Sequence, residues 1–468
     1  MKNPIFTGAA VAIVTPMNAD GSVNYDELKK MIDFQIDNGT DAIVICGTTG
    51  ESSTLTDEEH VNVIKCCIDH TAGRVPVIAG TGSNDTEYAI SLSKEACELG
   101  ADALLLVTPY YNKTSQRGLI AHYTAIADAV DKPIILYNVP SRTGVNILPE
   151  TLKELSKHPR INGVKEASGN ISQVMKIHAL CDEDLNIWSG NDDQITSILA
   201  CGGIGVISVL SNVLPQETHD IVQTYLDGNA FESTKLMAKY LELANALFCD
   251  VNPIPVKEAL NQMGFQAGPC RLPLYETSDA NKKYLTDVFD AEKARNDIQR
   301  AKEMADVVMV VMHVGVEYQQ DVDDETKQWV DLFLEEGVDI VIGSHPHVVR
   351  TMETLTGEDG HKMLVYYSLG NFTSTQNDLP SLLGAMAKIT IRKNIETGEI
   401  EIPEHEFIPL LMYYDRENPA AAIYKLEDYP EELIKKHSVY KANPTEFSKE
   451  YYEKLFEEIK SKGNDEEI

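Results

Sequence analysis

The feature that most constrains the fold is an eightfold alternation of short apolar runs with amphipathic stretches. Each apolar run is bounded by turn residues, as expected of a buried strand. The helical patterns between the runs often end at glycine, which is typical of a helix C-terminus. Eight evenly spaced units favour a closed (β/α)8 barrel, or TIM barrel, of class α/β over an open doubly wound sheet. The predicted strands are residues 9–14, 42–46, 75–80, 103–107, 133–138, 161–165, 186–190 and 204–209.

The chain continues well beyond the eighth unit. Helical patterns at 217–247, 254–263 and 276–289 exceed what a barrel needs, and we expect them to form a packing or oligomer module. All eight cysteines precede residue 271, and the acidic excess per residue is larger in the last part of the chain. We therefore predict two domains, residues 1–290 and 291–468.

Composition excludes several classes of function. The net charge of −33 argues against general affinity for nucleic acid or acidic lipid. No apolar run reaches the ~20 residues needed to cross a bilayer. The cysteines show no paired CxxC spacing, which is typical of buried thiols in a reducing compartment. We expect a cytoplasmic protein with neither a nucleic-acid nor a membrane partner.

Lys165, in the segment 161-INGVKEASG-169, stands at the end of a predicted buried strand. A charged amine there must be paired, neutralised or used in chemistry. Active sites of such barrels form at the carboxyl ends of the strands, so other residues at those ends should meet this amine. The polar residues at those ends are Thr48 and Thr49 in a GTTGE turn, Tyr110, Tyr111, Tyr137 and Arg142.

These groups suit one kind of chemistry. A neutral lysine amine attacks a carbonyl to form an imine, which then serves as an electron sink. Phenols can transfer protons, and the GTTGE turn and Arg142 can each hold a carboxylate. The strand ends carry no Asp, His or Cys cluster with metal-ligand spacing. The pattern therefore predicts carbon–carbon bond formation between a keto acid and an aldehyde.

Simpler interpretations exist for each feature by itself. A strand-end lysine is often a solvated charge, adjacent tyrosines often only pack, and a GTTG turn is weakly specific. Their joint occurrence at five strand ends favours a site.

Six longer words extend the argument. GTTGES, VTPYYNK, YNVPSRTG, GVKEASG, GVISV and NPIPVKEAL occur in this order between residues 3 and 289. In these words the chain resembles the dihydrodipicolinate synthase family of pyruvate-dependent aldolases. The resemblance implies condensation of pyruvate with L-aspartate-4-semialdehyde to 4-hydroxy-tetrahydrodipicolinate, in lysine and diaminopimelate biosynthesis. It implies no cofactor beyond the covalent pyruvate–lysine imine. N-acetylneuraminate lyase and the sugar-acid aldolases are alternatives, but Arg142 in SRTG and the double threonine favour the synthase.

The resemblance also implies a role for individual residues. Lys165 would form the Schiff base, and Tyr137 would transfer protons in a relay with Thr48 and Tyr111. In the family a neighbouring subunit supplies the residue that matches Tyr111, so we expect a homo-oligomer, at least a dimer and commonly a tetramer. The remaining substrate contacts implied are Thr49 with the pyruvate carboxylate, Arg142 with the semialdehyde carboxylate, and the backbone of Ile207 at the pocket wall.

Feedback inhibition by lysine is a further implication. Four residues match the lysine-binding cleft of inhibited relatives: Ser52, His60, Asn84 and Tyr110. However, Asp57 stands where those relatives have histidine, and Tyr88 where they have glutamate. Without a carboxylate at 88 the lysine ammonium would bind poorly, so we expect weak or absent inhibition.

The second part contains histidines at the ends of predicted strands. Strands are predicted at 306–312, 339–343 and 363–371, with a helix at 324–336. His313, His345 and His347 are candidate ligands of a divalent metal.

The words MHVGVEYQ, GVDIVIGSHPHV and YYSLGNF resemble CapA-type capsule or poly-γ-glutamate synthesis proteins of the calcineurin-like metallophosphatases. Val314 stands where that family has tryptophan, and the family's first half, with its carboxylate ligands, has no counterpart here. We therefore expect a partial metallophosphatase-like segment with an uncovered apolar face and weak or absent phosphoesterase activity. A metal-dependent phosphoesterase in capsule metabolism remains the alternative function.

Overall fold

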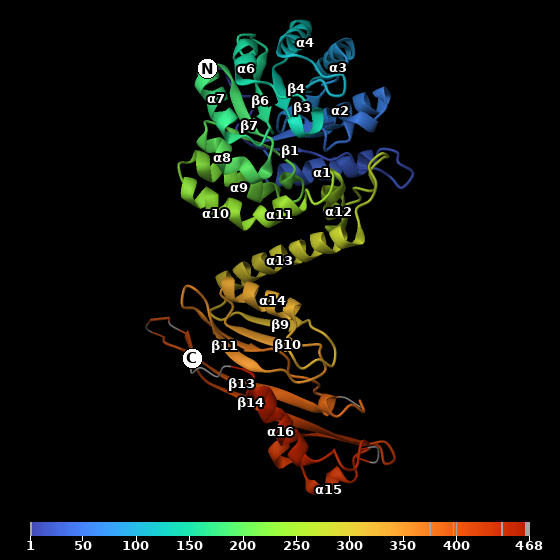
Figure 1. Ribbon diagram of the computed structural model, residues 1–468, viewed down its shortest axis with the longest axis vertical. Helices are drawn as coiled ribbons and strands as arrows, with labels where there is room; N and C mark the ends of the chain where they lie inside the picture. Colours follow the sequence, from blue (N-terminus) through green and yellow to red (C-terminus); the bar gives the residue numbers. More distant parts are fainter. Residues whose placement is uncertain (1, 374–375, 396, 399, 441–442, 464–468) are drawn as a thin grey trace. The chain divides into compact units, whose positions relative to one another are not determined.

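Eight parallel strands close into a barrel in the computed structural model, which describes residues 2–373, 376–395, 397–398, 400–440 and 443–463 (Figure 1). Each strand pairs with the next one along the chain, and β8 pairs with β1. The predicted (β/α)8 barrel is therefore confirmed. The strands are β1 (Gly8–Ala12), β2 (Ala42–Ile45), β3 (Val77–Gly80), β4 (Ala103–Val107), β5 (Ile134–Asn138), β6 (Ile161–Glu166), β7 (Asn186–Ser189) and β8 (Gly205–Ser208).

Helices surround these strands (Figure 1). Several begin at a residue whose side chain accepts a free backbone N–H of the first turn, namely Asn24, Thr56, Asp85, Ser115 and Asn170. The helices of the barrel are α1 (Tyr25–Asp37), α2 (Asp57–Thr71), α3 (Thr86–Leu99), α4 (Gln116–Ala129), α5 (Pro140–Thr143), α6 (Pro149–Leu155), α7 (Ile171–Cys181) and α8 (Ile195–Ala200).

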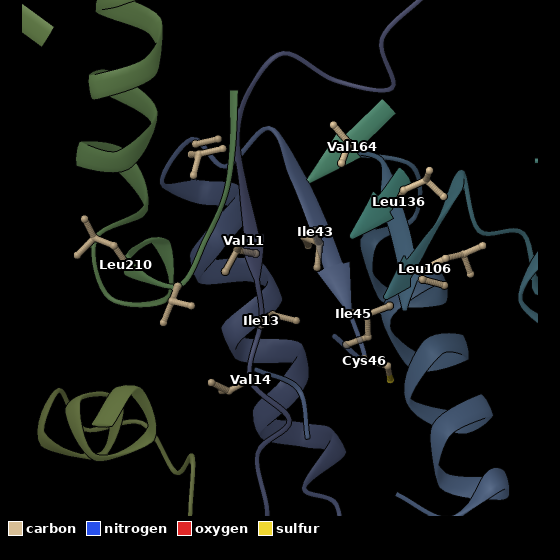
Figure 2. Close-up of a cluster of buried hydrophobic side chains, with 14 of the residues drawn as sticks. Val11, Ile13, Val14, Ile43, Ile45, Cys46, Leu106, Leu136, Val164 and Leu210 are labelled. Carbon is tan, nitrogen blue, oxygen red and sulfur yellow. The ribbon is translucent and has the colours of Figure 1, made fainter. Parts of the chain in front are cut away.

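Residues alternate between two apolar layers along the strands, with one irregularity at the start of β6, where the pairing with β5 shifts by one residue. On β2, Ile43 and Ile45 belong to the cluster between the strands and the helices, whereas Ala42 and Val44 belong to the barrel interior. Figure 2 shows the outer cluster, with Ile43 beside Val11 of β1. This twofold period places every second side chain of a strand inside the barrel, which is how Lys165 comes to point inward.

Gly163 is required by close packing inside β6. A Cβ atom on this residue would lie 2.5 Å from the Trp188 ring and 2.5 Å from the Asn186 carbonyl oxygen. Trp188 is completely buried in the barrel interior and stacks on Phe6, with ring centroids 5.2 Å apart. The glycine therefore leaves the space that the largest interior side chain occupies.

A helical extension follows the barrel. It consists of α9 (Pro215–Leu226), α10 (Ala230–Lys239), α11 (Leu241–Ala246), α12 (Ile254–Gln262) and α13 (Asp279–Met304). The single stretch predicted at 217–247 is thus three helices. None of the helices in the described residues is long and apolar enough to cross a membrane.

The chain divides into two compact units, residues 1–289 and 290–468. The division falls inside α13 rather than in a loop. Leu285 and Val288 of this helix pack into the barrel unit's core, and Ile298 packs into a core of the second unit.

The second unit is built on two sheets. A four-stranded sheet has the order β11-β12-β10-β9, and a three-stranded antiparallel sheet has the order β13-β14-β15. The helix and three strands predicted for this part are present, but the sequence analysis assigned no element after residue 371. The elements are β9 (Met309–His313), α14 (Asp324–Glu335), β10 (Ile340–Ser344), β11 (Met352–Thr356), β12 (Lys362–Tyr366), β13 (Leu383–Lys393), β14 (Ile400–Asp415), β15 (Ala420–Lys425), α15 (Glu431–Ile434) and α16 (Lys449–Lys460).

Both faces of the four-stranded sheet are at least partly covered. Val330 and Phe333 of α14 pack on one face, and Ile402 of β14 packs in a cluster with Leu364 of β12. The expected uncovered apolar face is present only in part: Val311 of the edge strand β9 is 71% exposed and lines a pocket that also includes Met309, Ile342, Phe372 and Met386. The strands β13 and β14, which the sequence analysis did not assign, pack on the face of the four-stranded sheet that was expected to be uncovered.

The outer core layer yields a stability prediction. Leu106→Ala would remove a fully buried side chain and leave a cavity, so it should lower the free energy of unfolding of the barrel by about 2–5 kcal/mol. Urea unfolding followed by tryptophan fluorescence tests this in a Trp329→Phe background, where Trp188 alone reports on the barrel. The matched control, Leu226→Ala on the surface of α9, should change the free energy of unfolding by less than about 0.5 kcal/mol. Equal losses from both variants would contradict the two-layer packing.

Candidate active site

A cavity of about 200 Å³ opens at the carboxyl ends of the barrel strands. This is the end at which the sequence predicted the site. The cavity brings together Lys165, Tyr137, Thr48, Thr49 and Arg142, as the sequence analysis expected, although these residues come from three separate strand ends, those of β2, β5 and β6. It is further lined by Ala12, Val44, Gly47, Leu105, Val139, Ser141, Ala167, Gly190, Asn191, Val209, Phe248 and Asn252.

Lys165 is held inside the barrel with its side chain against Tyr137. The two residues are paired in register on β6 and β5, and Nζ lies 4.5 Å from the centre of the Tyr137 ring. Lys165 is only 5% exposed. A Cβ atom on Gly190 would lie 3.1 Å from both Cγ and Cε of the lysine, so this glycine leaves room for the aliphatic stem.

The pKa of Lys165 is low for a lysine. Burial lowers it to about 8, the negative charge of Asp192 opposes this fall, and the positive charge of Arg142 adds to it. The neutral form of the amine is therefore much more populated near neutral pH than in an exposed lysine. Asp192 is itself buried, and its Oδ2 accepts the backbone N–H groups of Val209 and Leu210 at 3.0 and 2.9 Å.

Two hydroxyl contacts complete the inner part of the site. The phenol of Tyr137 is hydrogen-bonded to the side chain of Thr48, and burial raises the pKa of this phenol. Asn252 Nδ2 donates to Thr49 Oγ1 at 3.0 Å, and Arg142 donates to the Asn252 carbonyl oxygen at 3.4 Å. The arrangement provides an amine of lowered pKa, a phenol–hydroxyl pair for proton transfer and a guanidinium for an anion.

Tyr111 and Ile207 lie apart from this group. Tyr111 is 91% exposed with a left-handed backbone φ of 66°, and it does not line the cavity of its own chain. Ile207 is fully buried among the interior side chains of the barrel, and Val209 lines the cavity instead.

The sequence analysis gave no role to Asn252 or Gly190, both of which line the cavity. Asn252 Oδ1 is buried without a hydrogen-bond partner among the described residues, so it is available to a ligand. The only sequence signal for Asn252 was its place in the word NPIPVKEAL, because no local pattern links residue 252 to the GTTGE turn.

Asp57 and Tyr88, the two positions at which this chain differs from lysine-inhibited relatives, contact each other. The Tyr88 hydroxyl donates to Asp57 Oδ1 at 2.7 Å, and burial together with this carboxylate raises the pKa of Tyr88 to about 12. His60 is buried and donates to the Gly80 carbonyl oxygen at 2.8 Å. Asn84 donates to the Tyr110 carbonyl oxygen at 3.1 Å, and Ser52 begins the short 3₁₀ turn Ser52–Thr54.

The three histidines of the second unit are neighbours. His345 Nδ1 and His313 Nε2 lie 3.1 Å apart, and His347 Nδ1 lies 2.9 Å from Asn371 Oδ1. Glu317 approaches His347 Nε2 at 3.8 Å. Across the described part of the chain, no group of three or more His, Cys, Asp or Glu side chains is arranged to hold a metal ion.

Comparison with known proteins covers both units. A model described as the bacterial capsule synthesis protein PGA_cap matches residues 254–376, which include the three histidines. This match confirms the resemblance of the second part to capsule synthesis proteins.

Three relatives illustrate the similarity of the first unit. The 4-hydroxy-tetrahydrodipicolinate synthase of Lachnoclostridium phytofermentans is 59% identical over 284 residues, 60% of this chain and 97% of the relative. That of Caldicellulosiruptor saccharolyticus is 58% identical over 282 residues, 60% of this chain and 95% of the relative. The chloride-inhibited dihydrodipicolinate synthase from Acinetobacter baumannii, solved in complex with pyruvate, is 43% identical with a TM-score of 0.60, covering 61% of this chain and 98% of that one.

A further model, described as the Dihydrodipicolinate synthetase family, matches residues 5–292, which is more than half of the chain. The match spans the whole barrel, including every strand end that contributes to the cavity. The chain therefore belongs to the dihydrodipicolinate synthetase family.

Proposed function

We propose that the first unit is a 4-hydroxy-tetrahydrodipicolinate synthase, a lyase that condenses pyruvate with L-aspartate-4-semialdehyde. The observation that carries this proposal is the Lys165 amine, buried inside the barrel with a pKa lowered to about 8 and lying 4.5 Å from the centre of the Tyr137 ring. The relatives that bear this name, and the relative solved with pyruvate, support the choice of substrates. The pathway is then lysine and diaminopimelate biosynthesis.

The first step is imine formation. The neutral amine of Lys165 adds to C2 of pyruvate, and loss of water leaves a Schiff base between the amine nitrogen and that carbon. Thr49 lines the cavity, and in this proposal its hydroxyl or backbone binds the pyruvate carboxylate. Imine formation takes protons from the amine and delivers them to the oxygen that leaves as water. We propose that Tyr137, which is hydrogen-bonded to Thr48, transfers these protons.

The second step forms the carbon–carbon bond. The imine loses a proton from the pyruvate methyl group, and the resulting enamine carbon attacks the aldehyde carbon of the semialdehyde. The aldehyde oxygen takes a proton, for which Tyr137 is the nearest candidate donor. Arg142 would bind the carboxylate of the semialdehyde, because a guanidinium holds a carboxylate through two N–H groups.

We further propose that the active enzyme is a homo-oligomer of at least two chains, with a tetramer as the expected form. Tyr111 supports this, since it is 91% exposed and does not line the cavity of its own chain, so it could join the proton relay only in the site of a neighbouring chain. A cytoplasmic location agrees with eight free cysteines, because such thiols persist in a reducing compartment.

Sensitivity to lysine should be weak or absent. Tyr88, at the position where lysine-inhibited relatives have glutamate, offers no carboxylate, and its hydroxyl donates to Asp57 Oδ1 at 2.7 Å. The Asp57 carboxylate, the acidic group in contact with residue 88, already accepts this hydroxyl. We propose that this contact competes with ammonium binding.

Covalent trapping tests the proposed function directly. Borohydride reduction in the presence of pyruvate should give a stable adduct that peptide mapping places on Lys165. Lys165→Arg should give no adduct, because a guanidinium does not form the imine, whereas the exposed-site control Lys157→Arg should label like the parent. An unlabelled parent, or a label on another lysine, would refute the assignment.

The pH dependence of imine formation provides a second test. Only the neutral amine reacts, so the rate of adduct formation should rise with pH through the lysine pKa of about 8. Asp192→Asn removes a negative charge that favours the protonated amine, so this rising limb should move to lower pH. The neighbouring exposed Asp193→Asn is the matched control and should leave the limb in place. A limb near the ordinary lysine value, or equal shifts in both variants, would contradict the role of burial.

Feedback can be measured by adding millimolar lysine to the synthase assay. We expect the parent to retain most of its activity, because Tyr88 offers no carboxylate and occupies Asp57. The double variant Asp57→His/Tyr88→Glu should gain inhibition, while Asp57→His alone should not. Strong inhibition of the parent would overturn the proposal on regulation without affecting the catalytic one.

A further inference from the structure

A buried ion pair stands directly behind the threonines of the candidate active site. Lys257 of α12 and Glu51 of the GTTGE turn lie 2.8 Å apart, with side chains only 2% and 1% exposed. Neither side chain lines the cavity, and the mechanism proposed above uses neither.

The hydrogen bonds of both groups are satisfied by three separate segments. Besides Glu51, Lys257 Nζ donates to the carbonyl oxygens of Thr15 at 3.1 Å and Pro269 at 2.7 Å. The other carboxylate oxygen of Glu51 accepts the backbone N–H of Arg271 at 2.9 Å. The pair thus joins the loop after β1, the GTTGE turn and the chain that follows α12.

The GTTGE turn depends on such anchoring. Glu51 has a φ of 52°, in the left-handed region that a residue with a side chain seldom occupies. The turn is also held from the β1 side, where Thr15 Oγ1 donates to the Gly50 carbonyl oxygen at 2.7 Å. A strained turn keeps one conformation only where surrounding contacts determine it.

The same two segments meet again inside the cavity. Thr48, on the turn, is hydrogen-bonded to Tyr137, and Thr49 accepts from Asn252, which precedes α12. Each partner of the ion pair is therefore within five residues of a group that lines the site. A shift of the turn relative to β5 would break the first contact, and a shift relative to the start of α12 would break the second.

We propose that Glu51 and Lys257 are positioning residues for the synthase reaction: their ion pair fixes the turn that presents Thr48 to Tyr137 and Thr49 to the keto acid. The inference rests on the proposed function. A general argument supports a positioning role over one in stability. A buried ion pair typically adds little stability compared with a well-packed apolar pair, whereas its directional hydrogen bonds specify one arrangement of the groups it joins.

The test separates geometry from stability with a double variant. Glu51→Gln and Lys257→Met each leave a buried charge without its partner and should lower the melting temperature, while Glu51→Gln/Lys257→Met leaves no unpaired charge and should recover most of that loss. We expect the double variant to keep a kcat that is on the order of 10- to 100-fold lower than the parent's, as misplaced catalytic groups produce. Recovery of both melting temperature and kcat to within about twofold would show a purely structural pair and overturn the proposal.

A matched control and a fallback keep the outcome decisive. Glu150 and Lys176 form an exposed pair between α6 and α7, and Glu150→Gln/Lys176→Met should leave kcat unchanged. If the double variant does not fold, Glu51→Gln alone is measured below its melting temperature, and an unchanged kcat there overturns the proposal. Borohydride labelling of Lys165 in the parent tests the proposed function separately, so its failure is distinguishable from failure of the positioning role.

Discussion

Removal of the Lys165 amine from water is the interaction on which the site depends. Burial inside the barrel disfavours the charged form, and this desolvation is the main cause of the lowered pKa. The nearby charges have opposite effects, since Asp192 favours the ammonium and Arg142 disfavours it. The buried space is itself specific to this residue, because Gly190 leaves room for the lysine stem. A nucleophilic amine near neutral pH therefore results from the packing of the barrel interior.

Closure of the barrel provides the rest of the chemistry. In a closed parallel sheet all strands end at one rim, so closure of the barrel is enough to bring side chains distant in sequence together. Lys165 of β6 and Tyr137 of β5 are neighbours in register. The threonines reach them from the turn after β2, and the helical extension contributes Asn252, which donates a hydrogen bond to Thr49 of that turn. The extension thus completes the site wall in addition to covering the barrel.

The second unit has a core of its own. Its four-stranded sheet is covered by α14 and the later part of α13 on one face and partly by β13 and β14 on the other. The histidines lie together at the ends of β9 and β10, but the described residues supply only Glu317 as a nearby carboxylate, 3.8 Å from His347. The unit therefore combines a folded framework with an incomplete ligand set.

The sequence by itself determined the barrel, its eight strands and the position of Lys165, Tyr137, Thr48, Thr49 and Arg142 at one rim. Such features follow from local periodicity and from a general rule about strand ends, so they can be read along the chain. Only the tertiary structure decided the features that depend on contacts distant in sequence. These include the exposure of Tyr111, the contact of Asn252 with Thr49, and the burial of Lys257 against Glu51 across 206 residues of chain. No local pattern encodes such pairs, because their partners are chosen by packing and by the need of each buried polar group for a hydrogen bond.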